Sequence, residues 1–262
     1  MRTTEKASLA VETLYQARAL EFVYPAKEGD AVTALTAIDF DIRKGEFLSI
    51  VGPSGCGKTS LMKLLTGLQH PTAGTLTFRD RAFDKPPPGI GMAFQDSLLL
   101  PWRSVLDNIL LPVEILHRPR AAYLDKAREL LATVGLTGAE GRNIWELSGG
   151  MRQRVSLCRA LIADPEVLLL DEPFAALDAF TREELWLVLQ ELQAKTGSTM
   201  VLITHQLSEA VFLSDRVIVL SRRPGTIVHE ETIDLPKPRS RADAYTPEFI
   251  AFANRLRLKI DH

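Results

Sequence analysis

The sequence has few cysteines, few aromatic residues and no long hydrophobic run. Its 262 residues include two cysteines, Cys56 and Cys158, and only 7% are aromatic. Two cysteines without metal-ligand spacing argue against a disulfide scaffold and predict free thiols in a reducing compartment. The longest apolar stretch, residues 98–116, is interrupted by charges and prolines, so no segment resembles a membrane span of roughly 20 apolar residues. We expect a protein that reaches a membrane only through a partner.

Neither sign of charge is in excess. There are 31 Lys and Arg residues against 33 Asp and Glu residues, which gives a formal charge of −2. Because a nucleic-acid footprint normally appears as a basic excess, this balance argues against nucleic acid as a partner. The hydrophobic fraction of 46% is that of an ordinary globular protein, and a chain of this length can bury a substantial core.

Alternation of apolar runs and helical patterns predicts an α/β fold with a parallel sheet and crossover helices. The apolar runs are residues 47–51, 167–170, 200–203 and 216–220, and the helical patterns include 182–195 and 206–213. Three segments instead alternate apolar and polar residues and predict antiparallel strands, at 19–24, 35–43 and 74–79. Helical spacing at 103–116 and 121–134 predicts a helical insertion, and a last helix is expected after Thr246.

A glycine-rich loop follows the first apolar run. Its sequence, GPSGCGKT at residues 52–59, fits the phosphate-loop pattern G-x-x-x-x-G-K-[ST] in full. Glycines let backbone N–H groups turn toward phosphate oxygens, and the following helix adds its positive end. We expect Lys58 to neutralise the β- and γ-phosphates and the Thr59 hydroxyl to ligate Mg²⁺. The residues expected to bind ATP here are Gly52, Pro53, Ser54, Gly55, Cys56, Gly57, Lys58, Thr59 and Ser60.

A second apolar run ends in two carboxylates, in the sequence VLLLDEP at residues 167–173. In a parallel sheet the carboxyl ends of the strands face the ligand crevice. We therefore expect Asp171 to hold Mg²⁺, directly or through water, and Glu172 to orient and activate the attacking water. His205 follows another strand, and for it we favour a γ-phosphate contact over a structural role.

Residues 147–154, LSGGMRQR, form a second glycine-rich start to a helix. A serine in the capping position and free N–H groups again suit an anion. One anion site suffices for an ordinary kinase. A second site, separated from the first by the helical insertion, therefore suggests that residues 147–154 serve a nucleotide held by another copy of the chain.

These motifs, in this order and spacing, resemble the ATPase subunits of ABC transporters over residues 20–228. The resemblance implies a P-loop NTPase core of the RecA-like type, with an antiparallel β subdomain and a helical insertion. It implies one ABC ATPase domain over residues 1–262. Its core with the β subdomain would take about 1–95 and 159–235, the helical subdomain about 96–158, and a C-terminal helical tail 236–262.

The resemblance also implies roles for individual residues. Tyr24 matches the aromatic residue that stacks on adenine, although an ordinary strand tyrosine remains the alternative. Gln95 matches the residue that meets Mg²⁺ and the attacking water, and that links the site to the membrane partner. By the same resemblance, Ser148, Gly149 and Gly150 would close over the γ-phosphate of the opposing subunit. Asp178, in the sequence ALD at residues 176–178, matches the D-loop and would contact the neighbour's phosphate loop. His205 matches the family's switch histidine.

Within the family, residues 98–108, 213–221 and 223–225 resemble the subgroup that drives nitrate, sulfonate and taurine importers. This implies an ATP-hydrolysing subunit that forms a homodimer with ATP bound. Integral-membrane permease subunits would hold it at the cytoplasmic face of the inner membrane, and an external solute-binding protein would act indirectly. Trp102 would either face the permease or pack in the core. Ala175 departs from the glycine common in this subgroup.

Two other hypotheses remain. A soluble ABC ATPase not coupled to transport would usually carry long coiled coils or two fused ATPase units, whereas this sequence has one phosphate loop and no heptad run. An unrelated P-loop kinase would leave the motif at residues 147–154 without a role.

Overall fold

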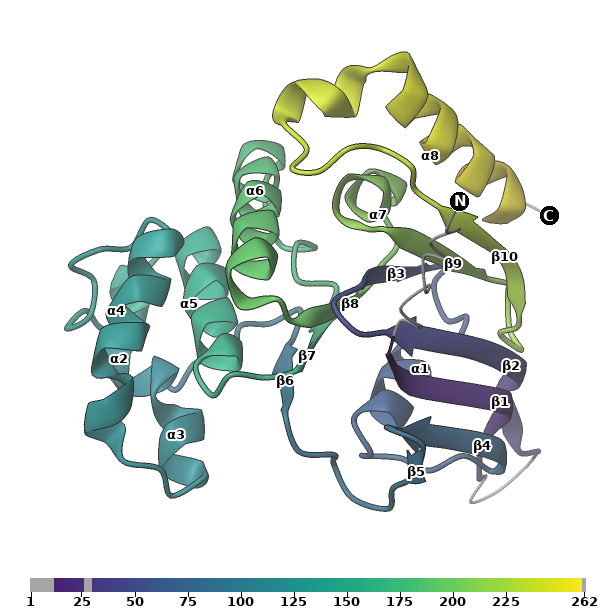
Figure 1. Ribbon diagram of the computed structural model, residues 1–262, viewed down its shortest axis with the longest axis horizontal. Helices are drawn as coiled ribbons and strands as arrows, with labels where there is room; N and C mark the ends of the chain where they lie inside the picture. The colour runs from purple at the N-terminus through teal and green to yellow at the C-terminus, as the bar shows by residue number, and fades with distance from the viewer. Residues whose placement is uncertain (1–11, 26–29, 261–262) are drawn as a thin grey trace, which may run out of the picture.

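Two β-sheets organise the computed structural model, which describes residues 12–25 and 30–260 (Figure 1). The larger sheet has six strands in the order β10-β9-β3-β8-β7-β6, and the smaller has four in the order β2-β1-β4-β5. Strands β9, β3, β8, β7 and β6 run parallel, β10 is antiparallel to β9, and the smaller sheet is antiparallel. The smaller sheet contains β1 (Thr13–Tyr24), β2 (Val32–Arg43), β4 (Ala73–Phe78) and β5 (Arg81–Ala82). The larger contains β3 (Phe47–Val51), β6 (Ile90–Ala93), β7 (Val167–Asp171), β8 (Thr199–Thr204), β9 (Arg216–Leu220) and β10 (Ile227–Thr232).

The central strands are buried on both faces, which explains their continuous apolar sequence. In β3, Phe47 and Val51 belong to a core that includes residues of α5 (Gly149–Leu161), α6 (Ala179–Thr196), α7 (Leu207–Leu213) and α8 (Pro247–Ile260). Leu48 and Ile50 belong to a second core, shared with the antiparallel sheet and α1 (Lys58–Leu65). Since successive side chains of a strand point to opposite faces, one short strand serves both cores. The predicted parallel sheet and antiparallel strands are confirmed.

A group of helices lies beyond the β6 edge of the larger sheet, at the left of Figure 1. It contains α2 (Val105–Ile109), α3 (Leu111–Ile115), α4 (Leu124–Thr133) and α5 (Gly149–Leu161), with short 3-10 turns at Arg120–Tyr123 and Ile144–Glu146. The single helix predicted over residues 103–116 is therefore two short helices. Pro112 explains the break, because it has no N–H to donate to the preceding turn.

Three further helices complete the described chain: α6 (Ala179–Thr196), α7 (Leu207–Leu213) and the predicted C-terminal helix α8 (Pro247–Ile260). Helix α8 crosses the top of the molecule in Figure 1 and packs on α7, where the rings of Phe249 and Phe212 lie 6.5 Å apart. A 3-10 turn at Arg241–Tyr245 precedes α8.

The segment before this turn contains a fully buried arginine, Arg239. Its Nη1 donates to the carbonyls of Val211, Phe212 and Ser214, at the carboxyl end of α7, over 2.7–2.9 Å. Its Nη2 donates to the carbonyl of Leu235 at 2.9 Å. Burial lowers the pKa of Arg239 to about 10. The guanidinium therefore satisfies main-chain acceptors that the end of α7 leaves open.

The sequence analysis did not identify the two edge strands of the larger sheet, β6 and β10. Strand β6 has four residues and contains Gly91, which weakens any strand pattern. A Cβ on Gly91 would lie 2.4 Å from the carbonyl oxygen of Ala160 in α5, so the glycine permits close packing of helix on strand. Strand β10 is half exposed and contains His229 and two glutamates, so it lacks an apolar run.

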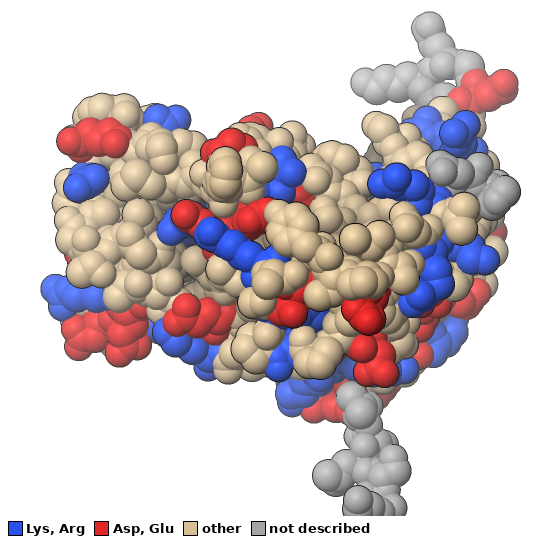
Figure 2. All heavy atoms as spheres, turned by 90° about the horizontal axis from the view of Figure 1, so that it is seen from above, with Lys and Arg blue, Asp and Glu red and all other residues tan. Residues whose placement is uncertain are grey.

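Within residues 12–25 and 30–260, no helix is both long and apolar enough to cross a membrane. On the face shown in Figure 2, basic and acidic side chains lie among one another. This mixture agrees with the near-zero charge of the sequence.

Candidate active site

The phosphate loop connects β3 to α1, as the sequence predicts. Gly57, the N-cap of α1, has a φ of 105°, which strongly favours glycine. A Cβ at this position would lie 2.6 Å from Leu35 Cδ2 and 2.8 Å from the Ala34 carbonyl oxygen. The motif glycine is therefore required both by its backbone conformation and by the strand β2 packed against it.

Lys58 lies within this loop and its residue is 6% exposed. Its Nζ donates to the carbonyls of Gly52 at 2.8 Å and Pro53 at 2.9 Å. Cys56 is fully buried below the loop, and burial raises the pKa of its thiol although Lys58 opposes this. The Cys56 side chain therefore fills space inside the loop. A raised pKa favours its thiol, which is less reactive than the thiolate.

The phosphate loop lines a cavity of ≈ 530 Å³. Its volume is within the range of small-molecule sites. It brings together residues from five separate parts of the chain. The lining residues are Tyr24, Ser54, Gly55, Gly57, Lys58, Thr59, Ser60, Glu172, His205 and Arg223.

The aromatic wall of this cavity is Tyr24, the last residue of β1. Its hydroxyl lies 3.0 Å from Ser60 Oγ in α1, and its ring meets that of Phe22 edge-on, with centroids 4.8 Å apart. These contacts hold the ring at the mouth of the loop. The predicted Tyr24 and Ser60 are therefore adjacent in space, although 36 residues separate them.

Glu172 and His205 face each other across the ends of β7 and β8. Glu172 Oε2 lies 3.0 Å from His205 Nδ1, and the two side chains are 24% and 50% exposed. Asp171 is the last residue of β7, and burial, together with the neighbouring Glu172 charge, raises its pKa while Lys58 lowers it. A cation bound beside Asp171 would lower this pKa again and keep the carboxylate ionised.

Several predicted residues do not line this cavity. Gln95 is exposed and lies two residues beyond the end of β6, the strand that pairs with β7. Gly52, Pro53 and Cys56 form the inner side of the loop, where the first two anchor Lys58. Asp171 is beside the cavity wall formed by Glu172.

The second predicted group forms a separate cluster around Thr181. Ser148 caps α5 by accepting the Met151 N–H at 3.3 Å, as its capping position predicts. Asp178 caps α6 by accepting from both the N–H and the hydroxyl of Thr181, which lowers the pKa of Asp178. A Cβ on Gly150 would meet Thr181 Cγ2 at 2.5 Å. The starts of α5 and α6 are thus packed together, and Ser148, Gly149 and Asp178 are exposed there.

Arg223 lines the cavity and was not predicted as a site residue. It belongs to the sequence Arg-Pro-Gly at residues 223–225, and Gly225 lies against the phosphate loop, since a Cβ there would be 2.1 Å from the Cys56 carbonyl oxygen. The signal available in the sequence was this turn after the β9 strand, at the carboxyl edge of the sheet.

The family model for ABC transporters matches residues 35–175, which is more than half of the chain. This chain belongs to the ABC transporter family. It is 40% identical to an uncharacterised ABC transporter ATP-binding protein of Methanocaldococcus jannaschii, over 97% of this chain and 92% of that protein. It is 44% identical to a taurine import ATP-binding protein of Pseudomonas syringae pv. tomato, over 82% of this chain and 83% of that one. The corresponding protein of Escherichia coli K12 is 41% identical, over 83% of this chain and 88% of its own length.

Solved structures agree with this assignment. A dimeric bacterial ABC transporter cassette has a TM-score of 0.74 and 28% identity, and covers 85% of this chain and 100% of its own. A post-hydrolysis dimer of that cassette, bound to ADP and phosphate, has a TM-score of 0.72. The structural likenesses confirm the P-loop NTPase fold. The taurine import relatives confirm the resemblance to ATP-binding subunits of the importer subgroup. The chain is an ATP-hydrolysing subunit of an ABC transporter.

Proposed function

We propose that the chain is the energy-coupling subunit of an importer for taurine, a sulfonate, nitrate or a related small solute. The cavity in which Tyr24, the phosphate loop, Glu172 and His205 meet carries the ATPase part of this proposal. The solute class is supported by the taurine import relatives, which are 41–44% identical over more than four-fifths of this chain.

ATP lies with its triphosphate against the start of α1 and its adenine on Tyr24. Lys58 contacts the β- and γ-phosphates, and the helix start adds N–H donors and positive potential. Tyr24 is suited to stacking because its hydroxyl is held by Ser60, so the ring loses little freedom when the base binds. Arg223 supplies a second cation on the cavity wall.

Thr59, Asp171 and Gln95 are the proposed ligands of Mg²⁺. Their hydroxyl, carboxylate and amide oxygens are the donors that this cation prefers. The raised pKa of Asp171 fits the assignment, because a neighbouring dication would restore its ionised form. When bound, Mg²⁺ neutralises charge on the phosphates.

Glu172 orients and activates the attacking water, and His205 contacts the γ-phosphate. Their mutual contact at 3.0 Å supports a joint role, since it fixes the position of both side chains at the cavity wall. His205 faces Glu172 through Nδ1, so its second ring nitrogen, Nε2, is left for the phosphate. These residues give this chain a base and a phosphate ligand on adjoining strand ends.

Ser148, Gly149, Gly150 and Asp178 act on the nucleotide of a second copy. They are exposed or partly exposed, gather at two helix starts, and do not line the cavity of their own chain. Two copies paired head to tail would place this cluster over the partner's phosphates. ATP is then held by both chains, and hydrolysis removes a contact that keeps them together.

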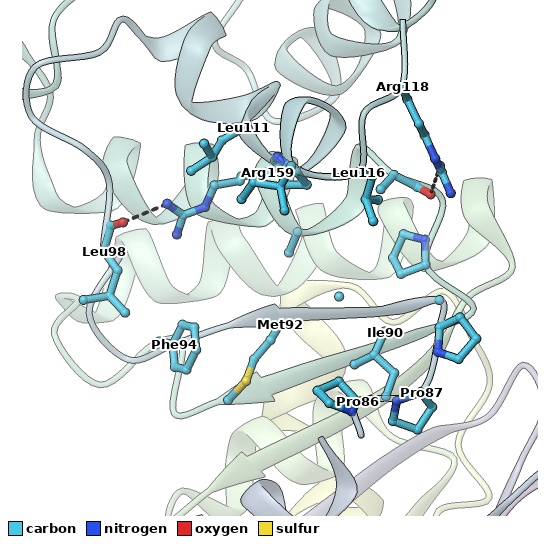
Figure 3. Close-up of a pocket in the computed structure, with 18 residues that line it drawn as sticks. Pro86, Pro87, Ile90, Met92, Phe94, Leu98, Leu111, Leu116, Arg118 and Arg159 are labelled. Atoms are coloured by element: carbon cyan, nitrogen blue, oxygen red, sulfur yellow. Dashed lines mark hydrogen bonds between the residues drawn. The ribbon is translucent and has the colours of Figure 1, made fainter. Parts of the chain in front are cut away.

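The permease binds in the apolar groove of ≈ 670 Å³ between β6 and the helices α3 and α5 (Figure 3). Pro86, Pro87, Ile90 and Met92 form one wall, and Leu111 and Leu116 face them from the helices. Arg159 holds the rim by donating to the Leu98 carbonyl at 2.7 Å. An apolar segment of the permease suits this groove. The chain leads from β6 to Gln95, the proposed Mg²⁺ ligand, two residues beyond the end of the strand.

Bound to a permease in this way, the chain would lie at the cytoplasmic face of the inner membrane as a peripheral subunit, and an external solute-binding protein would act through the permease. The competing hypothesis is a soluble ABC ATPase not coupled to transport. Purifying the tagged chain from membranes and reconstituting what accompanies it in liposomes decides between them. We expect a permease to copurify and ATP-dependent uptake of taurine, a sulfonate or nitrate. An ATPase that copurifies with no membrane protein would refute the importer assignment.

A further inference from the structure

Arg182 connects the D-loop to the loop that carries His205. It lies one turn into α6, and its side chain is 20% exposed. Its Nη2 donates to the carbonyl of Leu177 at 2.9 Å, and Leu177 belongs to the D-loop, residues 176–178. Its Nη1 donates to Gln206 Oε1 at 3.0 Å, immediately after His205. The planar guanidinium therefore spans the D-loop and the loop that carries His205.

Glu209, in α7, closes this connection into a ring. The residue is 2% exposed, and its Oε1 lies 3.7 Å from Nε of Arg182, a buried atom that has no hydrogen-bond partner among the residues that the structure describes. Its other oxygen accepts from the hydroxyl of Thr204. That hydroxyl in turn accepts from the N–H of Gln206 at 3.0 Å. The ring thus runs from Arg182 through Gln206, Thr204 and Glu209, and His205 lies between two of its members.

We propose that Arg182 and Glu209 are positioning residues that couple the D-loop to His205, so that contact with a second copy at Asp178 sets the position of the histidine. The coupling rests on the proposed roles of Asp178 and His205. It adds to them a path within one chain, built from residues that do not line the nucleotide cavity.

The geometry explains how the coupling works. Arg182 donates to the carbonyl of Leu177, which is the residue before Asp178. A displacement of the D-loop must therefore move the guanidinium or break this charge-assisted hydrogen bond. The fork of the guanidinium fixes the direction of both of its bonds, which a flexible ammonium would not do. The buried carboxyl of Glu209 lies beside Nε of Arg182 and limits movement of the guanidinium on that side. The backbone of His205 is thereby held from both flanking residues.

The test is steady-state ATPase kinetics on the full chain, with Arg182→Met and Gln206→Ala each made alone and together with His205→Ala. In the otherwise unchanged protein, we expect R182M to lower kcat about tenfold with KM for ATP within about twofold. When His205 is already alanine, the same change should alter kcat by less than about twofold, because the group being positioned is gone. Q206A opens the ring at a half-buried residue without leaving a carboxylate unpaired, and should show the same dependence on His205 if R182M does not fold.

Arg128→Met is the matched control. Arg128 is 58% exposed in α4 and pairs only with Asp125 in the described structure, so its loss should leave kcat unchanged. Unaltered kcat in both R182M and Q206A would overturn the coupling, and so would an equal fall with and without His205. Full activity of H205A alone would instead overturn the proposed role of His205. The two failures are therefore distinguishable.

Discussion

Replacing Glu209 with glutamine should make the stability of the protein less dependent on pH. Burial raises the pKa of this carboxyl to about 7, and the hydrogen bond from Thr204 and the charge of Arg182 only partly oppose the effect, while Glu172 adds to it. In the unfolded chain the value returns to about 4.5. Between these values the folded state keeps a proton that the unfolded state has released, so stability falls as pH rises.

The magnitude follows from proton linkage. This carboxyl has a pKa of about 7 in the folded state and 4.5 in the unfolded state. Its titration therefore lowers the free energy of unfolding by about 2 kcal/mol between about pH 5.5 and about pH 8. Glutamine has no proton to release and can still accept from Thr204. The stability difference between E209Q and the unmodified protein should therefore shift by about 2 kcal/mol in favour of the variant between these two conditions.

Urea unfolding at the two pH values measures this shift, because subtracting the variant from the unmodified protein cancels every other titrating group. Glu191→Gln is the control: its side chain is 52% exposed on α6 and pairs with Lys195, so its removal should not change the slope with pH. Parallel pH profiles for E209Q and the unmodified protein would refute the assignment of a proton to buried Glu209 near neutral pH.

The other predictions concern the nucleotide site, the permease surface and the C-terminal segment. Lys58→Ala should weaken ATP binding at least about tenfold in calorimetry, because it removes a buried charge facing the phosphates, and unchanged affinity would exclude Lys58 from the site. Glu172→Gln should lower hydrolysis by about 10²–10⁴-fold and accumulate an ATP-dependent dimer in size-exclusion chromatography, which Ser148→Arg should abolish; full ATPase activity would contradict the water-activating role. Trp102→Ala should reduce permease binding or transport but leave ATP affinity and thermal melting intact, because its residue is 75% exposed, and a large loss of stability would show a core role instead. Arg239→Met should destabilise the fold by about 3–5 kcal/mol in urea, because several buried carbonyls lose their donor, and a change below about 1 kcal/mol would contradict that accounting.

The predictable parts of the fold are those in which local sequence and tertiary position agree. Strands 47–51 and 216–220 are buried on both faces, so their apolar runs identify them without knowledge of their neighbours. The phosphate loop is predictable because its spacing is set by the backbone around phosphate. Strand β6 is not predictable from its local sequence. Gly91 permits the close contact with α5, and the strand conformation of β6 comes from its pairing with β7.

The unpredicted parts of the site depend on contacts between distant residues. Arg223 reaches the cavity because the turn at Gly225 packs on the phosphate loop, far away in sequence. Arg182 and Glu209 are 27 positions apart, and nothing in the local spacing of α6 or α7 indicates that they meet. Sequence motifs therefore predicted the groups that we propose to contact a ligand, whereas the residues that hold those groups in place could be found only in the folded structure.

The geometry at Glu172 shows why adjacency in sequence does not decide the site. Asp171 and Glu172 are neighbours, and in an extended strand their carboxylates would point to opposite faces of the sheet. Glu172 has instead a φ of 45°, in the left-handed region, where a residue with a side chain carries a cost of about 1–3 kcal/mol. Its N–H donates to the Ile203 carbonyl at 2.9 Å, which ties the turn to β8. Because β8 also leads to His205, the strained turn and the histidine share one support, and the 3.0 Å contact between their side chains follows from it.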